Sequence, residues 1–166
     1  MYLRPNGQSA RRDRQMNTQA GTLRASTAGQ LVSVLYRSHA LLSRDAFEAS
    51  GAPAQFAANN RLRGITGYLH IEDGMFYQHL EGEAGAIGPL WNAIAADPRH
   101  RDVTEIGGGA IATRRFDRWA MGYNASDHRS LFDWTARSGL SLKGRHYAQV
   151  LTAFLEYASA GARVPA

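Results

Sequence analysis

The chain has 166 residues and a formal charge of +5, and 44% of its residues are hydrophobic. This length suits one domain with appendages, and there is no apolar run of about 18 residues that would predict a membrane span. Cysteine is absent, which excludes disulfides, thiolate nucleophiles and cysteine-ligated metals and is compatible with a cytoplasmic protein.

The positive charge is concentrated at the N-terminus. Residues 1–28 carry five Arg and one Asp, whereas the rest of the chain has 14 basic and 13 acidic residues. This segment has few large apolar groups, so we expect a disordered basic extension that could touch nucleic acid only weakly. An Arg-rich, acid-poor start is also typical of organelle transit peptides.

The first predicted elements are a strand and an interrupted helix. The strand Leu31–Ser38 alternates apolar residues and places Tyr36 near its end, where a phenol is stable if its hydroxyl finds a partner. The helix is predicted over Ser43–Asn59 with Ser43 as its N-cap. Pro53 should kink or restart this helix, and the two asparagines Asn59 and Asn60 should end it.

A hairpin follows. Two alternating strands, Ile65–Ile71 and Met75–Leu80, are joined by Glu72-Asp73-Gly74, in which glycine allows a positive φ. Gln78 lies on the apolar face of the second strand, where an amide without partners costs on the order of 1–3 kcal/mol. It either faces a polar ligand or, as a more ordinary explanation, bonds water or backbone at a sheet edge.

The remaining elements complete a sheet and cover it. A helix over Ala84–Ala96 is followed by a strand at Val103–Ala112, which three glycines weaken, and a short strand at Trp119–Tyr123. Two C-terminal helices are predicted over Leu131–Ser138 and His146–Ala160. Their apolar faces are expected to comprise Phe132, Leu151, Phe154, Leu155 and Tyr157.

The order of these elements predicts an α+β fold, a ferredoxin-like βαββαββ sheet. Two helices should cover one face and the C-terminal helices the other. The candidates for chemistry are Tyr36, Asn60, Gln78, Trp119 and Met121, none of which is a conventional catalyst. The six histidines show no spacing suited to a metal.

Two other classes of protein use this topology. An acylphosphatase-like enzyme would need an anion cradle after the first strand, where Arg37-Ser38-His39 lacks the glycines for one. An RNA-binding module would need exposed aromatics flanked by basic residues, and Met75–Leu80 contains no Lys or Arg. A ferredoxin-like binding module and an acylphosphatase-like enzyme both stay alternatives.

Several blocks together carry a resemblance to one family. They are LVSVLYRS with Tyr36, NNRLRGITG, GMFYQHLEG with Gln78, DPRHRDV and RRFDRWAMGY. Over about Gln30–Ala125 the sequence resembles the BLUF domains, blue-light sensors that use FAD. The resemblance divides the chain into the extension at 1–28, a BLUF-like flavin-binding domain at 29–125 and a C-terminal helical extension at 126–166.

The resemblance implies a role for each matching residue. Tyr36 would give an electron and a proton to the excited flavin, and Gln78, between Tyr36 and the flavin, would rearrange its hydrogen bonds to produce a reversible red shift. The flavin-binding residues would be Tyr36, Asn59, Asn60, Gln78, Asp97 and Arg99. The residues that relay the signal would be Trp119 and Met121.

The resemblance also implies the cofactor and the partners. The cofactor would be FAD, with FMN or riboflavin possible, held non-covalently between the two helices. About 40 residues follow the last strand, too few for an enzymatic effector domain, so we expect a stand-alone receptor. It would signal to an unidentified protein and form a homo-oligomer. Small residues near Ala52, and Pro53, depart from the bulkier family pattern.

Overall fold

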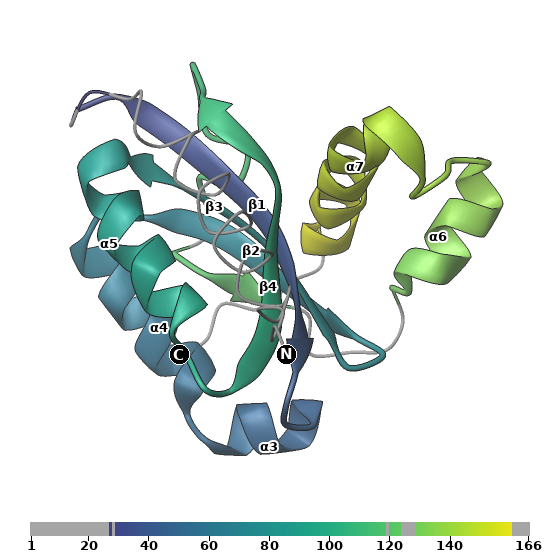
Figure 1. The fold of residues 1–166 in the computed structure, drawn as a ribbon, viewed down its shortest axis with the longest axis horizontal. Coiled ribbons are helices and arrows are strands. Elements are labelled where there is room, and N and C mark those ends of the chain that lie inside the picture. Colours follow the sequence, from purple (N-terminus) through teal and green to yellow (C-terminus); the bar gives the residue numbers. More distant parts are fainter. Residues whose placement is uncertain (1–26, 28, 119, 124–128, 161–166) are drawn as a thin grey trace, which may run out of the picture.

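The computed structural model describes residues 27, 29–118, 120–123 and 129–160. The predicted N-terminal extension and Trp119 therefore lie outside the described residues, apart from Thr27. Both faces of a central sheet carry helices, as the sequence predicts (Figure 1). The α+β ferredoxin-like class is confirmed.

The sheet contains five strands in the order β4-β1-β3-β2-β5. The strands are β1 (Leu31–Ala40), β2 (Thr66–Glu72), β3 (Met75–Glu83), β4 (His100–Ala110) and β5 (Gly122–Tyr123). β3 pairs antiparallel with both β1 and β2, and β5 pairs parallel with β2. The central strand β3 thus lies between the first strand and its own hairpin partner, which places Gln78 in the middle of the sheet.

Three helices cover one face of the sheet. They are α3 (Arg44–Ala49), α4 (Ala52–Leu62) and α5 (Ala84–Ala95). The break predicted at Pro53 is confirmed, because Gly51 adopts a φ of 72° and the proline stands in the first turn of α4. Ser43 caps α3 by accepting a hydrogen bond from the Ala46 N–H. Phe47 and Phe76 pack with Leu69 below these helices.

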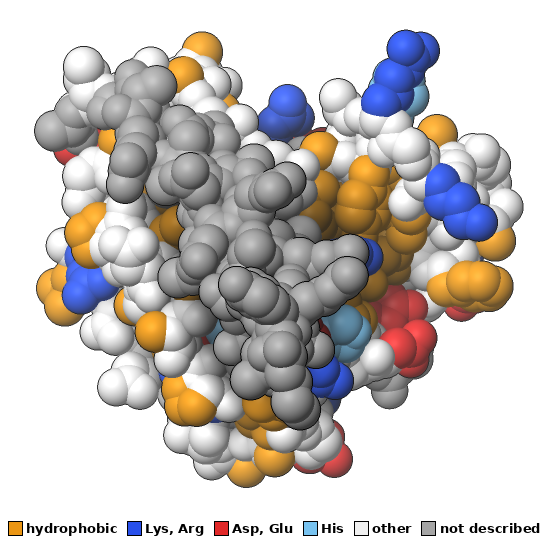
Figure 2. Space-filling view, in the orientation of Figure 1, with side chains coloured by type: hydrophobic (Ala, Val, Ile, Leu, Met, Phe, Trp, Pro, Cys, Tyr) orange, Lys and Arg blue, Asp and Glu red, His pale blue; other side chains and the backbone are white. Residues whose placement is uncertain are grey.

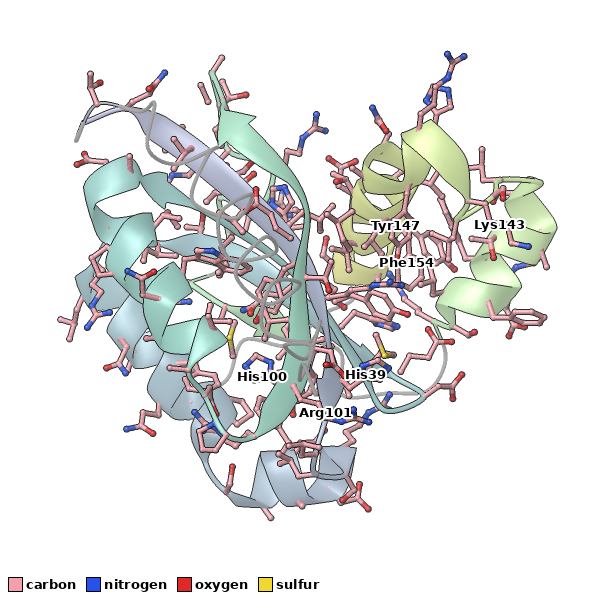
Figure 3. The ribbon with its side chains drawn as sticks, in the orientation of Figure 1. His39, His100, Arg101, Lys143, Tyr147 and Phe154 are labelled. Atoms are coloured by element: carbon pink, nitrogen blue, oxygen red, sulfur yellow. The ribbon has the colours of Figure 1, made fainter. Side chains whose placement is uncertain are left out.

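The C-terminal helices cover the opposite face. They are α6 (Leu131–Ser138) and α7 (Tyr147–Ser159), the latter preceded by a 3-10 turn, η1 (Gly144–His146). Phe154 points from α7 toward the sheet and is fully buried among Leu35, Tyr68 and Phe116 (Figure 3). Figure 2 shows hydrophobic side chains gathered over this part of the molecule.

Two of the residues predicted to lie on the apolar faces of the C-terminal helices are exposed. Phe132 is 75% exposed and Tyr157 is 40% exposed. α6 is only eight residues long and contacts its surroundings through Leu131 and Trp134, so Phe132 falls on its outer side. The Tyr157 ring keeps contacts with the rings of Trp134 and Phe154, and its other neighbour is the guanidinium of Arg129, 5.2 Å from the ring centre.

Several helices and strands begin or end at residues other than those predicted. The helix expected to end at Asn59-Asn60 continues to Leu62, because Asn60 turns inward and Gly64, at a φ of 63°, supplies the turn to β2. The strand expected from Val103 starts at His100, and in the described residues the last strand is only Gly122–Tyr123. None of the helices in the described residues has the length and apolar character to cross a bilayer.

Candidate functional site

Tyr36 and Gln78 are direct partners on the neighbouring strands β1 and β3. Both side chains are buried on the face covered by α4 and α5. The phenol of Tyr36 donates a hydrogen bond to Oε1 of Gln78. The amide predicted to be anomalous on an apolar face therefore has a buried partner and does not lie at a sheet edge.

Tyr36 lies in apolar surroundings that keep its proton in place. The edge of its ring meets Trp91 of α5 at a centroid distance of 5.3 Å. Burial, and to a smaller extent the negative charge of Asp97, raises the pKa of Tyr36 well above its ordinary value of 10.0. Tyr36 is consequently a neutral hydrogen-bond donor near neutral pH.

The other end of the Gln78 amide meets Met121. Nε2 of Gln78 lies 3.7 Å from the sulfur of Met121, which is buried just before β5. A thioether is a weak acceptor, whereas the phenol on the opposite side is a full donor. The amide thus has unequal partners at its two ends, and a change in its orientation would exchange them.

Asn60 is the second buried amide of the site. Its Nδ2 donates to the carbonyl of Ala120 at 2.9 Å, so α4 is tied directly to the segment that carries Met121. Its backbone carbonyl accepts hydrogen bonds from Arg63 and Ile65 at the end of α4. Asn59, its neighbour, is exposed and lines the opening of the same cavity.

Asp97 and Arg99 form a tight pair beyond α5. The guanidinium of Arg99 contacts both carboxylate oxygens, with Nε 2.9 Å from Oδ1 and Nη2 2.5 Å from Oδ2. These hydrogen bonds hold the pKa of Asp97 below its usual value despite partial burial. The Arg99 guanidinium also lies 4.7 Å from the centre of the Phe56 ring, which connects the loop to α4.

One cavity of about 270 Å³ joins these residues. It lies between the sheet and helices α4 and α5, and its volume is near the lower end for small-molecule sites. The predicted cofactor residues that line it are Tyr36, Asn59, Asn60, Gln78, Asp97 and Arg99, together with the predicted relay residue Met121. Trp119 lies outside the described residues.

The cavity also has walls that the sequence did not identify. They are formed by Arg63, just after α4, and by His100, the first residue of β4 (Figure 3 shows His100). Nδ1 of His100 is 2.7 Å from the buried hydroxyl of Ser38, and Nε2 is 2.8 Å from the Ile94 carbonyl. Because a carbonyl only accepts, Nε2 carries a proton, and His100 therefore joins α5 to β1.

The lining fits a planar heteroaromatic ring. Leu69, Phe76 and Ile94 supply apolar walls, and the amides of Asn60 and Gln78 supply donors and acceptors at the ring edge. The opening carries the guanidinium groups of Arg63 and Arg99. The described residues contain no group of three His, Asp or Glu side chains that could hold a metal ion.

The geometry does not favour the two alternative classes. Ser38, the centre of the possible anion cradle, is fully buried and bonded to His100. The aromatic residues of β3 do not form an open platform, since Phe76 is buried below the helices and Tyr77 packs toward the α7 side. An RNA-binding module of the predicted kind needs those rings exposed.

Comparison with known proteins gives one consistent family. The sequence model of the BLUF family, described as sensors of blue-light using FAD, matches residues 31–122, over half of the chain. The alpha subunit of the photoactivated adenylate cyclase of Euglena gracilis is 33% identical over 85 residues, which cover 51% of this chain but only 8% of that subunit.

Two solved structures extend the likeness to the fold. BlrB, titled a BLUF protein in its dark state, superposes with a TM-score of 0.67 at 28% identity, covering 79% of this chain and 98% of BlrB. Klebsiella pneumoniae BlrP1, solved with FMN and cyclic diGMP, superposes with a TM-score of 0.57 at 29% identity, covering 75% of this chain and 34% of BlrP1.

Proposed function

The chain belongs to the BLUF family of blue-light sensors that bind a flavin, and on this premise we propose how its own residues perform that function. The flavin ring occupies the cavity between the sheet, α4 and α5 without a covalent bond. Tyr36 and Gln78 are the photochemical pair. The observation that carries the proposal is their buried hydrogen bond at the wall of this cavity.

Binding of the ring rests on shape and on two amides. The buried amide of Asn60, whose Nδ2 donates to the Ala120 carbonyl, would hold the polar edge of the ring. Gln78, on the wall of the same cavity, would also bond the ring. Asn59, Asp97 and Arg99, which line the cavity as well, would hold the side chain of the flavin.

The light response needs a proton donor and an amide that can exchange its hydrogen-bond donor and acceptor groups. The bound flavin supplies absorption of blue light and acceptance of an electron and a proton. Tyr36 is the donor, since its phenol is protonated and already directed at Gln78. When the amide of Gln78 rotates or tautomerises, the group that it presents to Tyr36 changes between acceptor and donor, so that the hydrogen bonding of the pocket changes without breaking a bond between heavy atoms.

FAD is the flavin we propose, because the family description names it. FMN is the alternative, since the related BlrP1 was solved with FMN. If the ring system fills the cavity of about 270 Å³, the remainder of the dinucleotide would extend beyond it, where the charged lining residues Arg63 and Arg99 could contact its phosphates. Mass spectrometry of the flavin released by acid distinguishes FAD from FMN and riboflavin.

We propose that the output is a contact with another protein and not catalysis. The described residues form the sensor fold and its two C-terminal helices. The chain covers only 8% of the cyclase subunit it resembles, so that subunit's activity is not transferred. A cytoplasmic receptor that acts as a homo-oligomer on an unidentified partner is the proposal.

The visible absorption spectrum of the purified protein, in the dark and then under blue light, tests this function. We expect a flavin spectrum that shifts slightly to the red and returns in the dark. A flavin spectrum that does not respond to light would contradict the roles of Tyr36 and Gln78. Protein that stays colourless after addition of FAD would contradict binding itself.

A further inference from the structure

The segment that carries Met121 is fixed at both of its ends. At its far end, Gly122 and Tyr123 pair with β2, and the carbonyl of Ala120 accepts the amide of Asn60. Its near end begins at Arg114, on the opposite side of the sheet from the cavity. Residues 114–116, at this near end, are held by contacts with β3.

Those residues are held by Glu81 of β3, whose side chain has no exposed surface. Its two carboxyl oxygens both lie 3.0 Å from the backbone nitrogen of Arg115, and Oε2 also lies 3.0 Å from that of Phe116. A buried carboxyl group is costly unless it is hydrogen-bonded, and here two backbone N–H groups satisfy it.

The side chain of Arg114 completes the attachment in the reverse direction. Nη1 donates to the backbone carbonyl of Glu81 and to the hydroxyl of Thr66, both at 2.8 Å, and Nη2 donates to the carbonyl of Gly64 at 2.7 Å. One planar guanidinium thus joins β3, the start of β2 and the loop that follows α4. We call these contacts of Glu81 and Arg114 the Glu81 clamp.

The clamp also lies close to the photochemical pair along the chain. Glu81 is three residues from Gln78 on β3, and the loop bound by Arg114 at Gly64 is continuous with Asn60. Phe116 is buried and its ring lies 5.1 Å from that of His79, so the clamped segment cannot shift without disturbing β3. Gln78, the partner of the Met121 sulfur, and Asn60, which donates to the neighbouring carbonyl of Ala120, thus both lie on elements that the clamp contacts.

We propose that Glu81 is a positioning residue for the light response: the clamp sets the place of Met121 and so the hydrogen bonding of Gln78. The inference rests on the proposed function of Tyr36 and Gln78, but concerns a carboxyl group on the other face of the sheet. Removing it should alter the photocycle through Met121, in addition to any loss of stability.

The first test is Glu81→Gln. Glutamine keeps one accepting oxygen and replaces the other by an NH2 group, so at least one of the three contacts to the N–H groups of Arg115 and Phe116 is lost together with the carboxylate. The readout that needs no light is the methyl signal of Met121 in methyl-¹³C methionine NMR. The chain has four methionines, and Met121→Leu assigns the signal. We expect the Met121 signal to move in Glu81→Gln and to stay in place in Glu156→Gln.

Glu156→Gln is the matched control because Glu156 is an exposed carboxylate that pairs with the side chain of Arg115 at 2.8 Å. If Glu81→Gln leaves the Met121 signal unmoved, the clamp does not position Met121 and the proposal is overturned. Should Glu81→Gln not fold, Arg114→Lys carries the same test, since lysine keeps the charge but cannot bridge three acceptors.

The second test is the rate of return from the lit to the dark state. We expect Glu81→Gln to change this rate roughly 3- to 10-fold, the effect of one lost hydrogen bond. In a Met121→Leu background the same substitution should have no further effect. An equal change in both backgrounds would overturn the route through Met121.

The experiments distinguish failure of the proposed light response from failure of the proposed role of the Glu81 clamp. A wild-type protein without a light response contradicts the proposed function, while the NMR signal still tests the clamp. A normal light response in Glu81→Gln, together with a lower melting temperature and an unmoved Met121 signal, would show that Glu81 serves stability alone and would overturn the clamp as a positioning site.

Discussion

The side chains of β3 alternate between the two faces of the sheet, and its polar residues have different surroundings on each face. On the cavity side, Gln78 contacts both Tyr36 and Met121 at the wall of the cavity. On the α7 side, His79 and Glu81 lie in a filled core among Phe116 and its neighbours. β3 thus carries polar residues on both faces. We expect the hydrogen bonds of Gln78 on the cavity side to rearrange, and those of Glu81 on the α7 side to stay in place.

The difference lies in how the polar groups are satisfied. Gln78 has one strong and one weak partner, so reversing its amide exchanges two side-chain contacts of limited cost. Glu81 accepts from backbone N–H groups, which cannot rotate away. Side-chain partners therefore permit a change of state, and backbone partners oppose one.

The largest effect is expected at the photochemical pair. Tyr36→Phe and Gln78→Leu should keep the flavin spectrum and abolish the reversible red shift, because each removes one end of the Tyr36–Gln78 hydrogen bond. The measurement is the difference between dark and illuminated absorption. Tyr77→Phe is the matched control, since Tyr77 lies on the other face of the same strand. A normal photocycle in Tyr36→Phe would disprove the mechanism.

The second prediction concerns the filled face. Phe154→Ala should lower the free energy of unfolding by about 3–5 kcal/mol, because it empties a fully buried site in the α7 core. Phe132→Ala, at an exposed position, should change it by less than about 0.5 kcal/mol. Urea unfolding measures both. Equal effects of the two substitutions would contradict the assignment of the faces.

The third prediction is a loss of folding stability in acid, caused by His79 on the α7 side of the sheet. Burial, and then the charge of Arg115, lowers the pKa of His79 from 6.5 to about 4. Between these values the unfolded chain binds a proton that the folded protein does not, so stability falls as the pH falls from 6.5 to 4. One pKa unit corresponds to about 1.4 kcal/mol, so this loss is on the order of 3 kcal/mol at most.

His79→Gln isolates this effect because glutamine does not titrate. Urea unfolding between pH 7 and pH 4 should show a smaller decrease of stability in the variant than in the wild type. The flavin spectrum should not change over the same range in either protein if the two faces act independently. A decrease of the same size in His79→Gln would assign the acid sensitivity to other groups.

Much of the fold could be predicted because its signals are local. The alternation in the hairpin, the break at Pro53 and the N-cap at Ser43 each depend on neighbours in sequence. Gln78 stands out because an amide on an apolar face needs an explanation, but the residue alone favours an ordinary bond at a sheet edge, and its predicted role comes from the family resemblance. In each case the residues that determine the structure lie within a few positions of one another in the sequence.

The rest depends on partners that the sequence does not reveal. Glu81 reads as a polar residue at the end of a strand, yet its partners lie 34 and 35 residues further along. Arg63 and His100 become cavity residues only when α4, α5 and β4 are assembled. The error at Phe132 has the same origin, because two turns of helix do not determine which side faces the core.

The smallest predicted effect is at Glu72, where the hairpin meets the start of α6. Glu72 accepts from the Ser130 hydroxyl at 2.5 Å and from the Leu131 N–H at 2.7 Å. Burial alone would raise the pKa of Glu72, but the hydrogen bonds from His70, Ser130 and Leu131 lower it to about 2. This stabilisation is complete above pH 4.5 and is lost as the pH falls toward 2.

Glu72→Gln keeps one accepting oxygen but removes the negative charge from the N-terminus of α6. The expected cost at pH 7 is about 0.3–1 kcal/mol, seen as faster amide hydrogen exchange in α6. The visible spectrum and its response to light should be unchanged, because Glu72 contacts α6 and not the cavity. A changed red shift in Glu72→Gln would show that docking of α6 reaches Gln78 through the sheet, and the two faces would then be coupled and not separate.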